Sequence, residues 1–170
     1  MQHPSPIAAN DRRLEALLLH REIDEFNGAY AAALDEGRLT DWAEMFTDDA
    51  FYVIISRENF DRGMPVGLIY CENKGMICDR AFAHEKTEMF APRYLRHYVT
   101  NVRVLGTAEG LIAAQANYLV LQTLVDEKTT IHQAGGYFDR FTRVAGRLLL
   151  HERHCIYDTL IIDNSLVLPV

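Results

Sequence analysis

Histidine and cysteine, the residue types that most often bind metal ions, are sparse in this chain, and their spacing does not suit a metal site. His151 and His154 are the closest pair of histidines in the sequence. Residues three positions apart on a strand point to opposite faces, so these two rings could not share one metal ion there. A Rieske cluster requires a Cys-x-His and a Cys-x-x-His pair, and the sequence contains neither. We therefore expect no metal or cofactor site in this chain.

Nucleophilic chemistry is equally poorly supported. The cysteines are Cys71, Cys78 and Cys155, a low and odd count that does not suggest a disulfide framework. On a helix expected over residues 69–84, Cys71 and Cys78 would lie about 10.5 Å apart, beyond the roughly 7 Å that a disulfide spans between Cα atoms. The sequence contains no Gly-x-Ser-x-Gly elbow. We expect reduced thiols, as in an intracellular protein, and no catalytic nucleophile.

Arg80 is expected on the same face of that helix as Met76 and Ile77, which makes its charge informative. A buried arginine is unfavourable unless it is paired. Arg80 should therefore contact a carboxylate, either within the fold or across an interface. The alternative is a long side chain that lies along the apolar surface and extends its charged end into water.

A second candidate site lies in the segment 94–105. Strand alternation places His97 and Asn101 on one face of this segment and Arg96 on the other. If the first face lines a concave sheet, His97 and Asn101 become polar groups in a half-buried cup, which is one way to form an acid–base pocket. The alternative is a hydrogen-bond network that braces the sheet.

These side chains must be positioned by helices in the first half of the chain. Residues 1–10 are expected to be a flexible lead, and Asn10 and Asp11 can cap a helix over residues 11–37. One apolar stripe recurs every three or four residues along this helix: Leu19, Ile23, Phe26, Tyr30 and Leu34. A second apolar group does not fit the stripe, which indicates either a bent or frayed first turn or contact with a partner: Leu14, Leu17 and Leu18.

The second half of the chain is predicted to be a β-meander. Four long segments are separated by breaks short enough for hairpins, so they should run antiparallel: residues 94–105, 111–125, 129–143 and 147–161. Before them we expect a short helix, a strand, a loop and a helix, over residues 40–46, 50–56, 57–66 and 69–84. This order implies an α+β fold, with helices on one face of a curved antiparallel sheet. The apolar tail, residues 165–170, is expected to pack against the body or against a neighbour.

Composition and charge exclude several classes of partner. The chain has 170 residues, of which 49% are hydrophobic and 24% charged, as in one globular domain with a well-filled core. Its net charge of −7 makes nucleic acid and anionic membranes poor partners. No uncharged apolar stretch reaches the length that spans a membrane. We expect a cytoplasmic protein.

A set of motifs in a fixed order carries a resemblance to a known family. The set comprises residues 41–50 (DWAEMFTDDA) with the strand 51–53 (FYV), residues 57–61 (RENFD), residues 76–80 (MICDR), the stretch 94–104 with its Arg96-His97 and Asn101-Val102, and residues 136–141 (GYFDRF). In this order the motifs resemble the small (β) subunits of bacterial aromatic-ring-hydroxylating dioxygenases, over residues 20–170. The region from Arg57 to Arg80 looks most like the small subunits for aromatic carboxylates, such as those of salicylate 5-hydroxylase and terephthalate dioxygenase, and benzoate and anthranilate dioxygenases are close relatives.

The resemblance implies a cone-like fold similar to nuclear transport factor 2 (NTF2) over residues 11–170, and a structural rather than catalytic role. It implies that the Rieske [2Fe-2S] cluster and the mononuclear iron belong to a separate large (α) subunit, with electrons supplied by NAD(P)H through a reductase. It also implies an α3β3 hexamer, with a trimer of this chain possible alone. Four residues match recurring family positions and are candidate structural or interface residues: Arg80, Arg96, His97 and Asn101.

Two other functions remain open. A stand-alone isomerase or dehydratase of the same NTF2-like fold could use His97 in the cone, with help from Tyr30, Tyr52 or Asp49, because burial shifts the pKa of such groups. This hypothesis predicts an open pocket that holds His97 and a carboxylate, and a filled cone would count against it. A binding or scaffold module without an enzymatic partner is the other hypothesis, and it predicts a homo-oligomer that functions without iron.

Overall fold

The computed structural model describes residues 6–86, 92–160 and 168–170 of the chain. Helices and strands are interspersed in the first half, and strands alone follow. In chain order they are α1 (Pro6–Asp35), α2 (Leu39–Ala43), β1 (Phe46–Ser56), α3 (Arg57–Asp61), β2 (Ile69–Cys71), α4 (Lys74–Lys86), β3 (Arg93–Ala108), β4 (Leu111–Leu124), β5 (Thr130–Val144) and β6 (Arg147–Tyr157).

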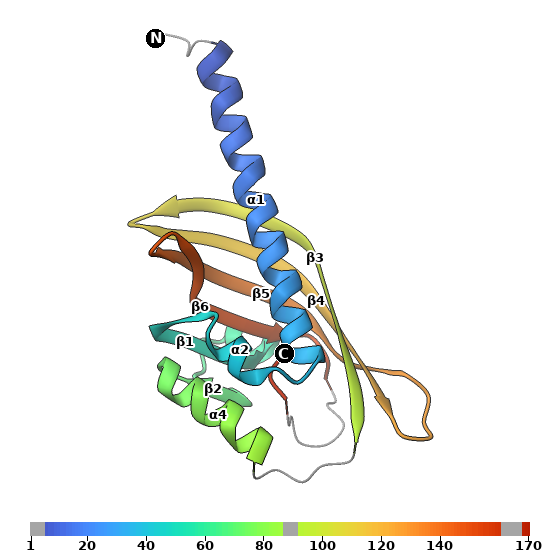
Figure 1. The fold of residues 1–170 in the computed structure, drawn as a ribbon. Coiled ribbons are helices and arrows are strands. Elements are labelled where there is room, and N and C mark those ends of the chain that lie inside the picture. The colour runs from blue at the N-terminus through green and yellow to red at the C-terminus, as the bar shows by residue number, and fades with distance from the viewer. Residues whose placement is uncertain (1–5, 87–91, 161–167) are drawn as a thin grey trace.

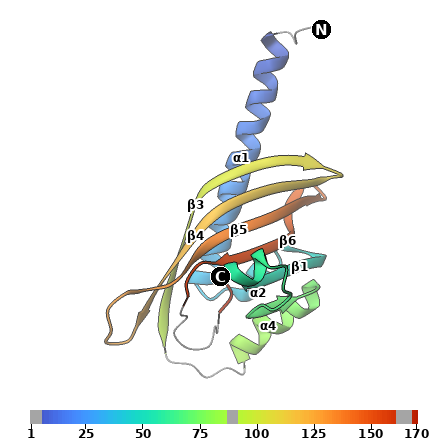
Figure 2. The same cartoon turned by 180° about the vertical axis from the view of Figure 1, so that it is seen from behind.

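The strands form one curved sheet in the order β2-β1-β6-β5-β4-β3. Strands β3 to β6 pair antiparallel with their sequence neighbours, so the predicted meander is confirmed. Strand β1 joins the meander by parallel pairing with β6, and β2 adds an antiparallel edge. The sheet curves around α1, while α2 and α4 lie beside β1 and β2 (Figure 1). The view from behind shows the opposite face of the same curved sheet (Figure 2).

Helix α1 begins earlier than its sequence suggested. Residues 6–10 already belong to the helix, so Asn10 and Asp11 lie inside it and do not cap it. Pro6 suits a first helical position, because its fixed φ matches a helix and the N–H that it lacks would have no partner there. The prediction of a flexible lead is therefore wrong for residues 6–10. Residues 1–5 lie outside the described part of the chain.

The region predicted as one helix over residues 69–84 is a strand followed by a helix. Ile69 and Cys71 are buried while the residue between them is exposed, and the three pair with the 52–54 stretch of β1. Asn73 then starts α4, because its side-chain oxygen accepts a hydrogen bond from the Met76 N–H at 3.0 Å. The loop predicted over residues 57–66 likewise begins with a short helix, α3, which is capped by Ser56.

The concave side of the sheet is filled by side chains. The largest buried rings are Trp42, Phe46, Tyr52, Tyr30 and Tyr137, and they meet edge-on, a favoured aromatic geometry. Of the apolar tail, residues 168–170 are described and pack into this core, with Val170 fully buried. The tail therefore packs against the body, as one of the two predicted alternatives stated, and residues 165–167 lie outside the described part.

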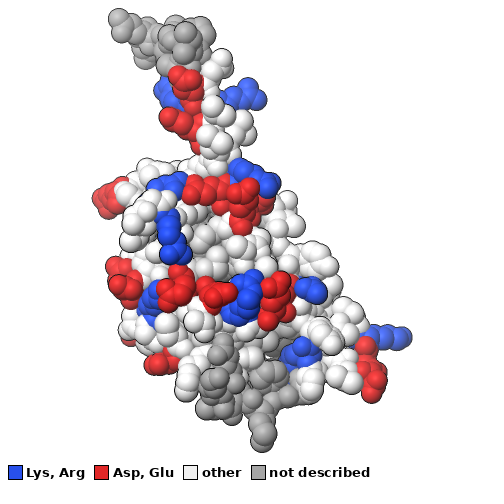
Figure 3. All heavy atoms as spheres, viewed as in Figure 1, with Lys and Arg blue, Asp and Glu red and all other residues white. Residues whose placement is uncertain are grey.

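The first half of α1 extends beyond the sheet (Figure 1). The helix is continuous from Pro6 to Asp35, and the off-stripe residues Leu14, Leu17 and Leu18 are 57–61% exposed. On the face seen in Figure 3, acidic and basic side chains are interspersed and form no continuous basic area. Among the described helices, α1 included, none is long and apolar enough to cross a membrane.

Candidate functional site

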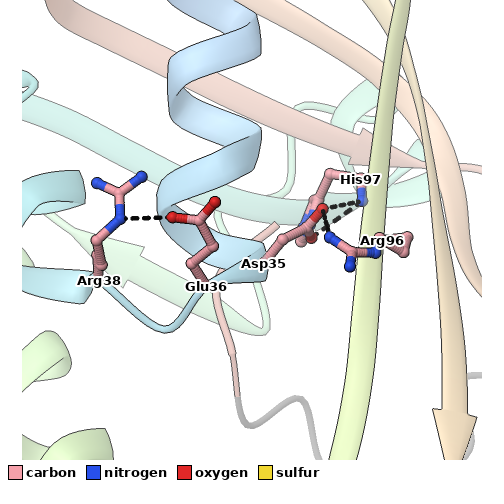
Figure 4. A network of polar contacts seen from close by, with 5 residues as sticks. All are labelled: Asp35, Glu36, Arg38, Arg96 and His97. Carbon is pink, nitrogen blue, oxygen red and sulfur yellow. Dashed lines mark hydrogen bonds and ion pairs between the residues drawn. The ribbon is translucent and has the colours of Figure 1, made fainter.

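The candidate residue His97 meets a carboxylate at the end of α1. Asp35, the last residue of α1, accepts hydrogen bonds from the main-chain N–H of His97 at 3.1 and 3.2 Å. Its Oδ1 lies 2.7 Å from Nδ1 of the same histidine (Figure 4). An acidic side chain at a helix C-terminus opposes the helix dipole, so these donors stabilise a carboxylate that would otherwise be unfavourable there. The hydrogen bonds between Asp35 and His97 connect the end of α1 to β3.

The geometry places a proton on Nδ1 of His97, because a carboxylate can only accept a hydrogen bond. The His97 side chain is 0% exposed, and its Nε2 has no hydrogen-bond partner within the described residues. A carboxylate that orients an imidazole in this way occurs in catalytic dyads. Here the free nitrogen points into a closed interior, so the pair acts as a brace in this state of the protein.

Arg96 lies on the other face of β3, as predicted. Its Nη1 is 3.7 Å from Oδ2 of Asp35, and its side chain is 66% exposed. An exposed ion pair of this length contributes little to stability. The two residues border a groove of about 430 Å³ between α1 and β3. Figure 4 shows this cluster with Glu36 and Arg38, which form their own contact on the far side of Asp35.

Asn101 is not beside His97 in the cone, so that part of the prediction is wrong. Its φ is +56°, and the pairing of β3 with β4 shifts register between Thr100 and Arg103. Asparagine tolerates this left-handed conformation better than most residues. The resulting bulge reverses the alternation, so Val102 faces inward and Asn101 is exposed.

Arg80 lies half-buried on α4, whose inward face carries Ile77, whereas Met76 is exposed. Met76 and Ile77, which were both expected on the face of Arg80, therefore differ in burial. Burial raises the pKa of the Cys71 thiol, and the nearby charge of Arg80 partly offsets that effect. The carboxylate partner expected for Arg80 stays a prediction.

Sequence reasoning missed the ion pair at the centre of the cone. The Arg153 guanidinium donates to both carboxylate oxygens of Asp139, at 2.8 and 2.7 Å, and to Oδ1 of Asn27 at 2.7 Å. It lies between two rings, 4.2 Å from the centroid of Tyr30 and 4.0 Å from that of Tyr137, a favourable cation–π arrangement.

Arg153 stays charged in this setting. Burial alone would lower its pKa, but the charge and hydrogen bonds of Asp139 raise it well above the ordinary value. A signal for the pair existed in the sequence. Strand alternation places Asp139 on the same face as Tyr137 and Phe141, and a carboxylate among inward-facing rings requires a cation.

The closely spaced histidines His151 and His154 contact different carboxylates. His151 lies 3.4 Å from the Asp49 carboxylate, and His154 lies 2.6 Å from that of Glu152. Among the side chains that the structure describes, no group of three or more histidine, cysteine or carboxylate residues could hold a metal ion. These residues therefore do not fit an iron centre or a Rieske cluster.

Comparison with known proteins identifies the family. The ring hydroxylating beta subunit family matches residues 29–164. The chain belongs to this family. It is 33% identical to the anthranilate 1,2-dioxygenase small subunit of Burkholderia cepacia, over 88% of this chain and 92% of that protein. It is 27% identical to a terephthalate 1,2-dioxygenase terminal oxygenase subunit beta 2 of a Comamonas species, over 88% and 97%.

A solved structure supports the same assignment. A crystallised beta subunit from Novosphingobium aromaticivorans DSM 12444, assigned to an aromatic-ring-hydroxylating dioxygenase, is 40% identical and superposes with a TM-score of 0.82. The match covers 90% of this chain and 97% of that one. The predicted family and the α+β cone-like fold are confirmed. The chain is the small subunit of a ring-hydroxylating dioxygenase and works as part of an oxygenase complex.

The stand-alone enzyme hypothesis meets one of its two conditions. His97 does have a carboxylate partner, Asp35. The cone, however, is filled by aromatic side chains, the Arg153 ion pair and Val170. A filled cone leaves the histidine without access to a substrate in this state.

Proposed function

We propose that this beta subunit supports the assembly of an iron-containing large subunit that hydroxylates an aromatic carboxylate. The two curated relatives described above carry this proposal, because the names of both proteins specify substrates, anthranilate and terephthalate, that are aromatic carboxylates. The chain contributes one domain, residues 11–170, to a cytoplasmic α3β3 hexamer. The large subunit carries the Rieske [2Fe-2S] cluster and the mononuclear iron, and NAD(P)H supplies electrons through a reductase.

An apolar cluster on the sheet face opposite α1 supports an assembly role. Val53, Ile55 and Ile156 form its buried centre, and Phe60 of α3 and Phe138 of β5 pack against them. A groove of about 290 Å³ beside these two rings is lined by Leu105 and Arg140 among others. The half-buried rings of Phe60 and Phe138 leave apolar surface next to the charge of Arg140, a combination typical of protein–protein contacts.

We assign the candidate residues interface or structural roles in this assembly. Arg96 and Asn101 are exposed on β3 and are proposed interface residues, as is the half-buried Arg80 on α4. His97 is a structural residue, because it connects β3 to the end of α1 through Asp35.

The proposal is tested by purifying the chain from its native host through a removable tag. We expect a co-purifying protein with the absorption and electron paramagnetic resonance spectra of a Rieske cluster, and a native mass that fits three copies of each subunit. Turnover should require the ring carboxylate, so benzoate-type substrates should react and the corresponding unsubstituted arenes should not. A chain that purifies without any iron protein would contradict the assembly role. Equal turnover of both substrate classes would contradict the carboxylate preference.

A further inference from the structure

Residues 168–170 occupy the centre of the cone in the way a ligand would. The main-chain oxygen of Val170 accepts hydrogen bonds from the hydroxyl groups of Tyr30 and Tyr52, each at 2.9 Å. The Cys155 thiol lies 3.4 Å from the same oxygen as a weaker donor. Three donors therefore converge on one acceptor oxygen, and the Val170 N–H bonds back to the Tyr52 hydroxyl at 3.2 Å.

These donors belong to the body of the fold. Tyr30 is on α1, Tyr52 is on β1, and Cys155 is on β6, which pairs directly with β1. All three are fully buried and are held by the sheet and by α1. The position that binds an oxygen is thus built by helix and sheet, and residues 168–170 fill it.

Aromatic rings surround this position. The Trp42 ring lies 5.5 Å from that of Tyr52 and 6.3 Å from that of Tyr30. Tyr137 lies 6.1 Å from Tyr30, and its buried hydroxyl has no hydrogen-bond partner in the described part of the chain. Edge-on rings favour an aromatic occupant, and a buried hydroxyl without a partner is unfavourable unless an occupant or water satisfies it.

Charge and protonation narrow the class of occupant. Burial raises the pKa of Tyr30 and of Tyr52, so both phenols stay protonated and can donate to an acceptor oxygen. Arg153 places a positive charge between the rings of Tyr30 and Tyr137, and Asp139 balances it. The arrangement suits a ring compound with an exocyclic oxygen that accepts hydrogen bonds.

We propose that the cone contains a latent binding site for a small aromatic compound with a carbonyl or carboxylate oxygen, and that residues 168–170 are a built-in competitor for it. The ligand oxygen replaces that of Val170 between Tyr30 and Tyr52. The ligand ring replaces the side chains of Leu168 and Val170. This site does not depend on a large subunit, so its failure and the failure of the assembly role are distinguishable.

The test uses the full chain and its single tryptophan, Trp42, as a fluorescent reporter beside the site. A Leu168→Ala/Val170→Gly variant weakens the hold of the tail by removing two side chains that pack on the core. The probes are benzoate, acetophenone and, as a ring without an oxygen, toluene. We expect benzoate or acetophenone to bind the variant at least about tenfold more tightly than the natural chain, and toluene to show no such gain.

Phenylalanine substitutions then test the oxygen position. Replacing Tyr30 and Tyr52 by Phe in the tail variant should abolish the gain. The matched control is Tyr118→Phe, because the Tyr118 hydroxyl is also buried but donates to Gln133 at 2.7 Å and not to the tail. A folded tail variant that binds neither oxygen-bearing probe would overturn the proposal, as would a gain that survives the Tyr30 and Tyr52 substitutions.

A second measurement serves if the tail variant does not fold. Cys155 is fully buried beneath the tail, so a thiol reagent labels it only in natural-chain molecules whose tail has left the site, and mass spectrometry of peptides separates it from Cys71 and Cys78. Benzoate at a concentration that saturates the site should occupy it in those molecules, slow the labelling of Cys155 and leave the labelling of Cys78, on helix α4, unchanged. An equal rate of Cys155 labelling with and without benzoate would reject the site.

Discussion

At the scale of single residues, a buried ion pair organises the interior of the cone. Arg153 and Asp139 are both fully buried side chains, and Asn27 completes the hydrogen bonding of one guanidinium nitrogen. Moving two charges out of water costs several kcal/mol each, roughly, before their attraction is counted. The pair therefore specifies one arrangement of α1, β5 and β6, because neither charge can be left alone.

Asp139→Asn should be among the most destabilising conservative changes in the chain. It keeps the shape of the side chain but leaves the Arg153 guanidinium buried without a counter-charge, which costs about 3–5 kcal/mol. Urea unfolding measures the loss. Glu25→Gln is the control, because it breaks the exposed ion pair with Arg21 and should cost less than about 1 kcal/mol.

The double variant Arg153→Met/Asp139→Leu separates charge from packing. It removes both charges and keeps apolar volume, so it should be more stable than Asp139→Asn. If the double variant is the less stable of the two, the unpaired charge is not the cause of the loss.

Glu152 should make the fold sensitive to acid. A hydrogen bond with His154 is the main cause that lowers the pKa of this carboxyl below its ordinary value of 4.5, and the charges of His154, Arg140 and His151 add to it. A group whose pKa is lower in the folded state adds stability above its unfolded pKa, and this stability is lost as the pH falls through the folded pKa. Free energies of unfolding measured from about pH 7 down to about pH 3 should therefore fall less steeply for Glu152→Gln than for the natural chain. Parallel curves would show that Glu152 contributes no pH dependence.

At the scale of elements, α1 consists of two parts with different environments. Ile23 is fully buried against the sheet, whereas Leu17 is exposed on the part that extends beyond it. Ile23→Ala should cost about 2–5 kcal/mol, because it leaves a cavity in the core. Leu17→Ala should change the stability of the isolated chain by less than about 0.5 kcal/mol. Thermal or urea unfolding checks both, and similar losses would mean that the extending part packs on the body in solution.

The elements also show what the sequence could and could not predict. The meander was predictable because hairpin strands are close in sequence and alternate in burial. The parallel pairing of β1 with β6 was not, because it joins Ile54 to Cys155 across the whole meander and local patterns carry no signal for it. The prediction of one helix over residues 69–84 was wrong, because β2 has three residues and is too short to show a periodic pattern. The helix itself begins only after the cap at Asn73. Asn101 was misplaced because a bulge reverses the alternation on which the prediction depended.

At the scale of the whole molecule, the described residues bury the His97, Arg153 and Asp139 side chains in the interior of the fold. His97 has the carboxylate of a catalytic dyad in Asp35, but its side chain is fully buried. The remaining space on the concave side is occupied by the Arg153 pair, the aromatic rings and Val170. A filled interior is what the proposed assembly role predicts.

His97→Gln tests this division of roles in the assembled oxygenase. Loss of the contact to Asp35 leaves a buried carboxylate with fewer donors and should lower the stability of the chain by about 1–3 kcal/mol. Complexes that still assemble should keep their turnover per iron within about twofold of the natural complex, because a stability effect does not change the chemical step. The control is Arg96→Gln, which removes only an exposed, 3.7 Å contact to the same carboxylate. Intact complexes of His97→Gln with turnover reduced by about a hundredfold or more, as expected for loss of a general acid–base group, would instead show that the cone opens during the reaction and that the Asp35–His97 pair takes part in it.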